Sequence, residues 1–262
     1  MSEAQRIPVL MYHRIDTPRN AWEARYAVSP RRFAAHMQAL HRSGYRAVPI
    51  AALIGWLEGR GSLPQGAIAI TFDDGFLSVY EHALPVLETL AWPFTVFLVS
   101  DRIGGTDTWS VNQNPSGRTY PLLGIDHIRA MQRLGVDFQS HTRTHPSLPR
   151  LNETALVEEL LGSRMALGEL LGREVYYLAY PFGHVDDRVE AAARAAGYRA
   201  AFSTFSGFNR RKINPFRIRR IDVFGTDSAR RLLRKVALGS NEGGLDAQLR
   251  YYWGRIKGRM SA

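Results

Sequence analysis

Two groups of polar residues, each directly after a short predicted strand, are the parts of this sequence best suited to chemistry. Asp73 and Asp74 are adjacent, follow the predicted strand 67–72 and precede Gly75. Two carboxylates this close repel each other, so either one holds a proton more strongly than usual or both need a cation. The same residues also suit a turn that caps a helix. Taken alone, this pair leaves the catalytic and the structural interpretations open.

His141 and His145 form the second group, after the predicted strand 136–140. Two histidines four residues apart can bind zinc from one helix face, but Pro146 disfavours the helical conformation at His145. We therefore expect a loop at a strand end, on the same rim as Asp73 and Asp74. Two imidazoles and one carboxylate are a common catalytic ligand set for a divalent metal. A shared rim favours this interpretation over unrelated surface histidines.

In this order and spacing, the two groups resemble the polysaccharide deacetylases, carbohydrate esterase family four. The first motif of that family, Thr-Phe-Asp-Asp-Gly, matches residues 71–75, and the second, His-Ser/Thr-x-x-His, matches residues 141–145. The resemblance extends from about residue 7 to about residue 224. Residues 9–14 are similar to the branch with the bacterial poly-N-acetylglucosamine deacetylases. The resemblance implies a distorted (β/α)7 barrel.

The resemblance also implies a role for each matched residue. Asp73 would be the general base, and Asp74, His141 and His145 would hold one divalent metal ion, most often zinc. Such an ion polarises the acetyl carbonyl and allows water to attack at neutral pH. The substrate would be an amino-sugar glycan.

The third motif of the family is only partly present. Residues 180–183 are similar to it, which implies that the backbone N–H of Phe182, next to Tyr180, faces the developing oxyanion. The arginine that often begins this motif and orients the base is missing from residues 175–179. The late Leu-x-His motif, which often supplies the general acid, is also missing, and residues 219–223 occupy its place.

Another residue must therefore protonate the leaving amine. His13 ends the first predicted strand, on the catalytic rim, and is our candidate for the acid, with a plain hydrogen-bonding role as the alternative. Asp222 is a second rim candidate, to orient an acid or to contact sugar. Of the other histidines, we expect three on helix surfaces, one as a helix cap and one in a loop: His36, His41, His82, His127 and His184. Trp109 would either stack on a sugar ring or fix its loop to the barrel.

Alternating apolar runs and amphipathic stretches must position these residues. The predicted strands are 7–12, 67–72, 94–99, 136–140, 176–180, 199–203 and 217–223. The predicted helices are 30–42, 78–90, 126–134, 152–171, 186–196, 228–238 and 245–257. This β-α alternation predicts an α/β protein with a parallel barrel, whose chemistry lies at the carboxyl ends of the strands.

Length and composition fit a single catalytic domain over residues 1–262, with a basic helical extension from about residue 226. The chain has no cysteine, so disulfides and thiolate metal sites are excluded. Its formal net charge is +10, with ten basic residues between 210 and 235. Such a surface suits anionic partners, although a solvated arginine-rich face explains it equally well.

The leading hypothesis is a metal-dependent N-deacetylase of N-acetylhexosamine units in a glycan or glycan precursor. The alternatives are a deformylase or O-deacetylase of a lipid-linked sugar, and a degenerate sugar-binding module. Nucleic acid is not an expected partner, because no recognition motif accompanies the charge. The N-terminal segment lacks a basic region and a long apolar run, so we expect a cytoplasmic protein. Basic residues lie beside aliphatic ones over 228–238 and beside aromatic ones over 249–257, which suggests reversible contact with an anionic inner-membrane surface, with closure of the barrel by the aromatics as the alternative.

Overall fold

Short strands alternate with helices over residues 5–243, which are the residues that the computed structural model describes. The strands are β1 (Val9–Tyr12), β2 (Arg46–Ala47), β3 (Ala67–Phe72), β4 (Thr95–Leu98), β5 (Asp137–Ser140), β6 (Tyr177–Ala179), β7 (Ala200–Phe202) and β8 (Ile221–Asp222). The α-helices are α1 (Pro30–Arg42), α2 (Ile50–Leu57), α3 (Leu84–Thr89), α4 (Ile125–Arg133), α5 (Glu153–Val157), α6 (Ser163–Leu171), α7 (Asp187–Ala195) and α8 (Ala229–Leu238). Every predicted strand, and every predicted helix up to residue 238, has a counterpart here. The predicted helix 245–257 lies outside the described residues.

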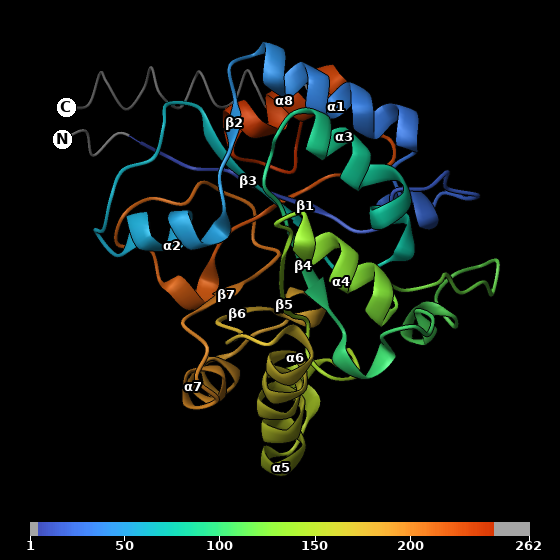
Figure 1. Cartoon of the computed structure of the whole chain (residues 1–262), viewed down its shortest axis with the longest axis vertical. Coiled ribbons are helices and arrows are strands. Elements are labelled where there is room, and N and C mark those ends of the chain that lie inside the picture. Colours follow the sequence, from blue (N-terminus) through green and yellow to red (C-terminus); the bar gives the residue numbers. More distant parts are fainter. Residues whose placement is uncertain (1–4, 244–262) are drawn as a thin grey trace.

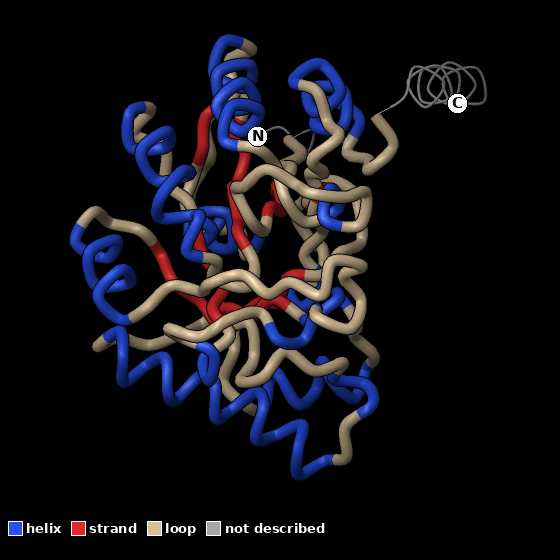
Figure 2. Tube along the Cα trace, turned by 90° about the vertical axis from the view of Figure 1, so that its right-hand side faces the viewer, coloured by secondary structure: helices blue, strands red, loops and turns tan. Residues whose placement is uncertain are grey.

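The strands form one curled sheet with helices around its outside (Figure 1). The strand order is β7-β6-β5-β4-β3-β1-β8, with β2 paired to the start of β3, and neighbouring strands are parallel. Parallel neighbours require a crossover connection, and the helices supply it. Figure 2 shows the strands at the centre, with helices outside and loops gathered at one side.

The segment 218–222 brings the two edges of the sheet together. Ile218 forms a parallel bridge with Phe202 at the end of β7, through Ser203 N–H to Ile218 O at 2.9 Å. Three residues later, Ile221 pairs with Leu10 of β1. One short segment thus contacts both edges in succession, which gives the distorted (β/α)7 barrel that the sequence predicts. That prediction is confirmed.

Side chains alternate between the inside and the outside of the curled sheet. On β3, Ile68, Ile70 and Phe72 belong to the larger hydrophobic cluster that contacts the helices. Ala67 and Ala69 belong to a second cluster, with residues from other strands around the sheet. The period of two of a strand produces this division. The next inward positions after Ala69 are therefore 71 and 73. The side chain of residue 73, just past the end of β3, thus points into the barrel.

The sequence did not predict β2 or α2. Strand β2 has only two residues, too few for an alternating pattern. Helix α2 has the sequence IAALIGWL, an apolar block without a polar face, and periodicity cannot distinguish such a block from a buried strand. Four of its side chains are buried, and they pack against the inner cluster of the barrel: Ile50, Leu53, Ile54 and Trp56.

Two of the predicted helices contain a π-helical turn. Val79–Ala83 precedes α3 within the predicted helix 78–90, and Glu158–Gly162 joins α5 to α6 within the predicted helix 152–171. Helix α8 lies beside α1 and buries Leu232 and Val236 in the core. The first part of the predicted basic extension therefore packs onto the barrel.

Candidate metal centre and active site

The carboxylates of Asp73 and Asp74 reach the carboxyl end of the barrel by different means. Asp73 continues the inward face of β3, two residues after Thr71, and both side chains are buried. Asp74 has a left-handed backbone, with φ of 71°, and Gly75 follows with φ of 78°. A Cβ atom on Gly75 would lie 2.7 Å from Leu98 Cδ2, and the left-handed backbone disfavours a side chain there, so glycine suits this turn. The turn brings two adjacent side chains to one site.

The histidine pair lies in a loop, as predicted. His141 follows Gln139 on the inward face of β5, and its Nδ1 lies 2.8 Å from the carbonyl oxygen of Ala179. Nδ1 must donate in this contact, which leaves Nε2 free as a metal ligand. His145 has φ of 67°, outside the helical region, and thus excludes a zinc-binding helix.

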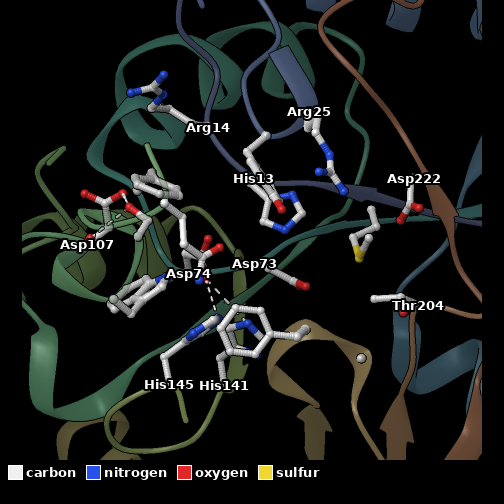
Figure 3. Close-up of a pocket in the computed structure, with 18 of the residues that line it drawn as sticks. His13, Arg14, Arg25, Asp73, Asp74, Asp107, His141, His145, Thr204 and Asp222 are labelled. Carbon is white, nitrogen blue, oxygen red and sulfur yellow. Dashed lines mark hydrogen bonds and ion pairs between the residues drawn. The ribbon is translucent and has the colours of Figure 1, made fainter. Parts of the chain in front are cut away.

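Asp74, His141 and His145 converge in the way that a divalent metal requires (Figure 3). Asp74 Oδ1 lies 3.5 Å from His141 Nε2 and 3.3 Å from His145 Nε2, and the ligand atoms all lie within 4.8 Å of one another. All three residues are buried, and Asp74 Oδ1 has no hydrogen-bond partner among the described residues. A buried oxygen without a partner is costly unless a cation satisfies it. The predicted ligand set therefore fits a metal ion.

Burial and neighbouring charges act in opposite directions on the four groups. Burial raises the pKa of Asp73, but the Arg220 guanidinium and His141 outweigh it, and the pKa falls below its usual value. Burial also opposes ionisation of Asp74, yet the two imidazoles bring its pKa far below the usual range. The pKa of His145 is lowered by burial, whereas that of His141 is raised by the two carboxylates against burial. Both carboxylates are therefore ionised at neutral pH.

Arg220 is the functional residue that the sequence analysis missed. Its Nη1 and Nη2 donate to the two oxygens of Asp73 at 2.7 and 2.8 Å, and its Nε donates to Ser203 O at 3.0 Å. The side chain is fully buried. It makes the contact with the candidate base that is expected of the missing third-motif arginine. The alternation from Ile218, which lies in the inner cluster, to Arg220 was the signal that could have revealed it.

His145 is held between two aromatic rings. The Trp109 ring stacks on it with centroids 4.6 Å apart and planes 19° apart. The Phe182 ring meets it edge-on at 4.7 Å. Trp109 therefore fixes its loop to the candidate metal ligand, the second of its two predicted roles. A ring face used in this way is not available to a sugar.

The third motif forms a tight turn beside the histidines. Phe182 has a left-handed backbone, with φ of 58°, and Gly183 follows with φ of 70°. A Cβ on Gly183 would lie 2.0 Å from Thr204 Oγ1, so this close approach requires glycine. Tyr180 is fully buried, and its hydroxyl has no partner among the described residues. Strain of this kind is typical of functional sites.

His13 and Asp222 lie on the opposite side of the cleft from His145 (Figure 3). The His13 ring is half-buried, points into the cleft and meets the Tyr26 ring edge-on at 5.4 Å. Asp222 Oδ2 accepts from Asn241 Nδ2 at 2.6 Å, while Oδ1 is buried without a partner among the described residues. Burial raises the pKa of Asp222. Both predicted rim residues thus line the cleft.

The remaining histidines mostly follow the predictions. His127 Nδ1 accepts from Gly124 N–H at 3.2 Å and caps α4. His184 lies in a loop and contacts Ser147 Oγ. The prediction of a surface position was wrong for His36, which is fully buried, because its Nε2 is 2.7 Å from Asp227 O in a polar contact under α8.

One cavity of about 360 Å³ connects the two groups of candidate residues. The ligand triad and Asp73 form its floor, and its lining also includes Trp22, Arg25, Tyr26, Trp109, Phe182 and Phe224. A concave site with apolar walls and a few converging polar groups is the usual form of a small-molecule site.

A buried carboxylate-and-imidazole centre at the carboxyl edge of a parallel barrel defines the class, an α/β barrel with a candidate metal site. The polysaccharide deacetylase family model matches residues 60–201, and the protein belongs to this family. The poly-β-1,6-N-acetyl-D-glucosamine N-deacetylase of Staphylococcus epidermidis is 26% identical over 187 residues. That match covers 68% of this chain and 61% of the relative, so the chain spans about three fifths of the relative's length.

Two solved structures share the fold over most of the chain. The polysaccharide deacetylase BC0361 from Bacillus cereus matches with a TM-score of 0.71 at 29% identity. The match covers 86% of this chain and 67% of the BC0361 chain. IcaB from Ammonifex degensii matches with a TM-score of 0.68 at 28% identity. The match covers 82% of this chain and 91% of the IcaB chain.

Proposed function

We propose that the protein hydrolyses N-acetyl groups on N-acetylhexosamine units of a glycan or glycan precursor. The observation that supports this most directly is the pairing of Asp73 with Arg220 beside the Asp74-His141-His145 set in one cleft. A sugar-binding module needs neither an ionised, oriented base nor a metal centre. Family membership, and the similarity to a poly-N-acetylglucosamine deacetylase, support the choice of an amino-sugar substrate.

The metal in this proposal is a single zinc ion, held by Asp74, His141 and His145. Two imidazoles and a carboxylate are a ligand set that zinc accepts, with positions left open for chemistry. The ion supplies positive charge that polarises the acetyl carbonyl and favours deprotonation of a nearby water. The Nδ1 contact of His141 with Ala179 O fixes the tautomer that presents Nε2.

Asp73 takes the proton from the attacking water in this proposal. Arg220 keeps the carboxylate ionised and holds it in one orientation through two hydrogen bonds. A base that is already oriented loses little entropy when the reaction begins. The backbone N–H of Phe182, beside His145, donates to the oxyanion that develops on the acetyl oxygen, with Tyr180 below the same turn.

His13 gives a proton to the departing amine. It lies in the same cleft as the base, at the carboxyl end of β1, which pairs with β3. Asp222, with one buried oxygen free of partners among the described residues, orients this end of the cleft or contacts the sugar. Trp22 and Tyr26 supply aromatic surface for the sugar rings next to the reacting unit.

Measurement of released acid tests the proposal. Zinc-loaded protein is incubated with N-acetylglucosamine oligomers and with synthetic lipid-linked N-acetyl and N-formyl amino sugars, and acetate and formate are quantified. We expect acetate from the oligomers, and none from His141→Ala, which should lose zinc and activity together. If formate is the only acid released, the activity is deformylation and not deacetylation. No acid from any substrate, with zinc bound, would contradict the proposal.

A further inference from the structure

The loop that carries the two candidate metal histidines is anchored by a carboxylate from a neighbouring helix. Glu159 Oε2 accepts from the backbone N–H of Arg143 at 2.8 Å and of Thr144 at 3.0 Å. Glu159 Oε1 accepts from Thr144 Oγ1 at 2.5 Å. Glu159 is buried, with 8% of its surface exposed. Three donors from the segment between His141 and His145 thus converge on one side chain outside the cleft.

This loop needs such an anchor because its backbone is strained. Thr142 and His145 have φ values of 68° and 67°, a region that costs a residue with a side chain about 1–3 kcal/mol. The loop contains no glycine, so this cost is not relieved by residue type. Within the loop, His145 N–H donates to Thr142 Oγ1 at 3.2 Å. Contacts from outside must supply the rest of the stabilisation.

The π-helical turn Glu158–Gly162 aims Glu159 at the loop. A π-helical turn inserts a residue into an otherwise α-helical segment and shifts the side chains around it, which occurs frequently at functional sites. Here the turn also places Gly162 under Arg143, where a Cβ atom would lie 2.7 Å from Arg143 Cδ. The opposite side of the loop pairs with the segment after β4, through Asp101 N–H to Arg143 O at 3.0 Å.

We propose that Glu159 is a positioning residue for the metal centre: its hydrogen bonds to Arg143 and Thr144 hold the loop in the conformation that aligns His141 and His145 with Asp74. It acts through Arg143 and Thr144, which lie between the two histidines, and not through a contact with a ligand side chain. The inference rests on the metal site of the proposed function.

Preorganisation of this kind determines affinity for the metal. Without the anchor, the loop can relax from its strained conformation, and metal binding must then restore that conformation at a cost in free energy. Loss of outer contacts that hold ligands usually lowers metal affinity by about 10–100-fold.

Zinc binding to the metal-free protein tests the inference. The variants are Glu159→Gln, which keeps the shape but removes the charge and one acceptor, and Glu158→Gln as the matched control. Glu158 is the exposed neighbour in the same π-helical turn. The zinc dissociation constant is measured by competition with a chromophoric chelator, and the melting temperature is measured without metal.

We expect Glu159→Gln to weaken zinc binding by about 10–100-fold, with Glu158→Gln equal to the parent protein. Zinc affinity in Glu159→Gln within twofold of the control would overturn the inference. If Glu159→Gln does not fold, Thr144→Ala decides, because it removes only the hydroxyl contact. Weaker zinc binding at an unchanged melting temperature supports the proposal, and unchanged binding refutes it. Tight zinc binding without deacetylase activity would contradict only the proposed function.

Discussion

The adjacent residues Asp73 and Asp74 have different partners, and this difference separates their proposed tasks. Both oxygens of Asp73 are occupied by Arg220, which lies inside the barrel. Asp74 Oδ1 instead lies near two imidazole nitrogens and has no hydrogen-bond partner among the described residues. An oriented, ionised carboxylate suits proton transfer, while an unsatisfied oxygen beside two imidazoles suits a metal. Identical side chains thus acquire distinct roles from their surroundings.

Replacement of Asp73 by Asn tests the base. The amide keeps the shape but cannot take a proton, so we expect kcat to fall by roughly 10²–10⁴-fold while zinc remains bound. Turnover on N-acetylglucosamine oligomers and zinc content, measured on the same preparation, give the result. Near-normal turnover would assign the proton to another group.

The role of His13 can be read from two substrates. His13→Ala should slow hydrolysis of an N-acetyl sugar by about 10²-fold or more, because an amine must be protonated to leave. An activated acetyl ester should be affected far less, because its leaving group departs as an anion. Equal losses in kcat on the amide and on the ester would indicate a binding or structural role for His13.

Arg220→Lys tests the orientation of the base. Lysine retains the positive charge but cannot donate two parallel hydrogen bonds to Asp73. We expect kcat/KM to fall by about 10²-fold through misalignment. The two hydrogen bonds from Arg220 help to lower the pKa of Asp73, so their loss in Arg220→Lys should raise that pKa and move the acid limb of the pH profile to higher pH. A pH profile that matches the parent would contradict this role.

Polar contacts join helix α7 to the segment that closes the barrel. Glu190 on α7 accepts from Asn214 Nδ2 at 2.8 Å and from Arg217 Nε at 2.9 Å. Asn214 in turn caps the 3₁₀ turn Pro215–Arg217, directly before Ile218 reaches β7. Helix α7 therefore holds the closing segment in place, and with it the approach of Arg220 to the barrel interior.

These contacts predict how stability depends on acid. They lower the pKa of Glu190 from 4.5 to about 2, against the effect of burial. A lowered pKa in the folded state stabilises the protein above pH 4.5, and this stabilisation is lost as the pH falls from 4.5 through 2. Glu190→Gln should therefore cost on the order of 1 kcal/mol at pH 7 and progressively less below pH 4.5. Urea unfolding across this range measures it, and a pH-independent difference would contradict the explanation.

Part of the excess positive charge is neutralised by ion pairs within the molecule. Of the ten basic residues between 210 and 235, four form ion pairs with other residues of the described range 5–243: Arg217, Arg220, Arg231 and Lys235. Leu232 and Val236 on α8 are buried and so are not available to a membrane. Among the described residues, no helix is long and apolar enough to cross a membrane. The basic and aromatic residues predicted over 249–257 lie outside the described residues.

We propose that the protein works in the cytoplasm and that any contact with the inner membrane is electrostatic and reversible. Each basic residue near an anionic surface contributes about 1 kcal/mol, and salt screens this attraction. Co-sedimentation with anionic vesicles should therefore be strong at low salt and weak at high salt. Retention in the supernatant at low salt would refute the membrane contact and leave the proposed hydrolase unaffected.

The sequence by itself determined the features that depend on local pattern. Short predicted strands end directly before Asp73 and His141, and parallel strands share one carboxyl edge, so the two groups were expected on one rim. Pro146 excluded the helical arrangement of the two histidines, and the loop was predicted correctly. These inferences succeeded because each depends on residues within a few positions of one another.

Tertiary structure alone decided the partners that hold those residues. Arg220 is 147 positions from Asp73, Trp109 reaches His145 from a separate loop, and Glu159 reaches Thr144 only through a π-helical turn. Nothing in the spacing of these residues indicates contact, because the curl of the sheet and the inserted helical residue determine which side chains meet. The reactive groups are fixed by local pattern, whereas their orientation depends on long-range packing, which no window of the sequence contains.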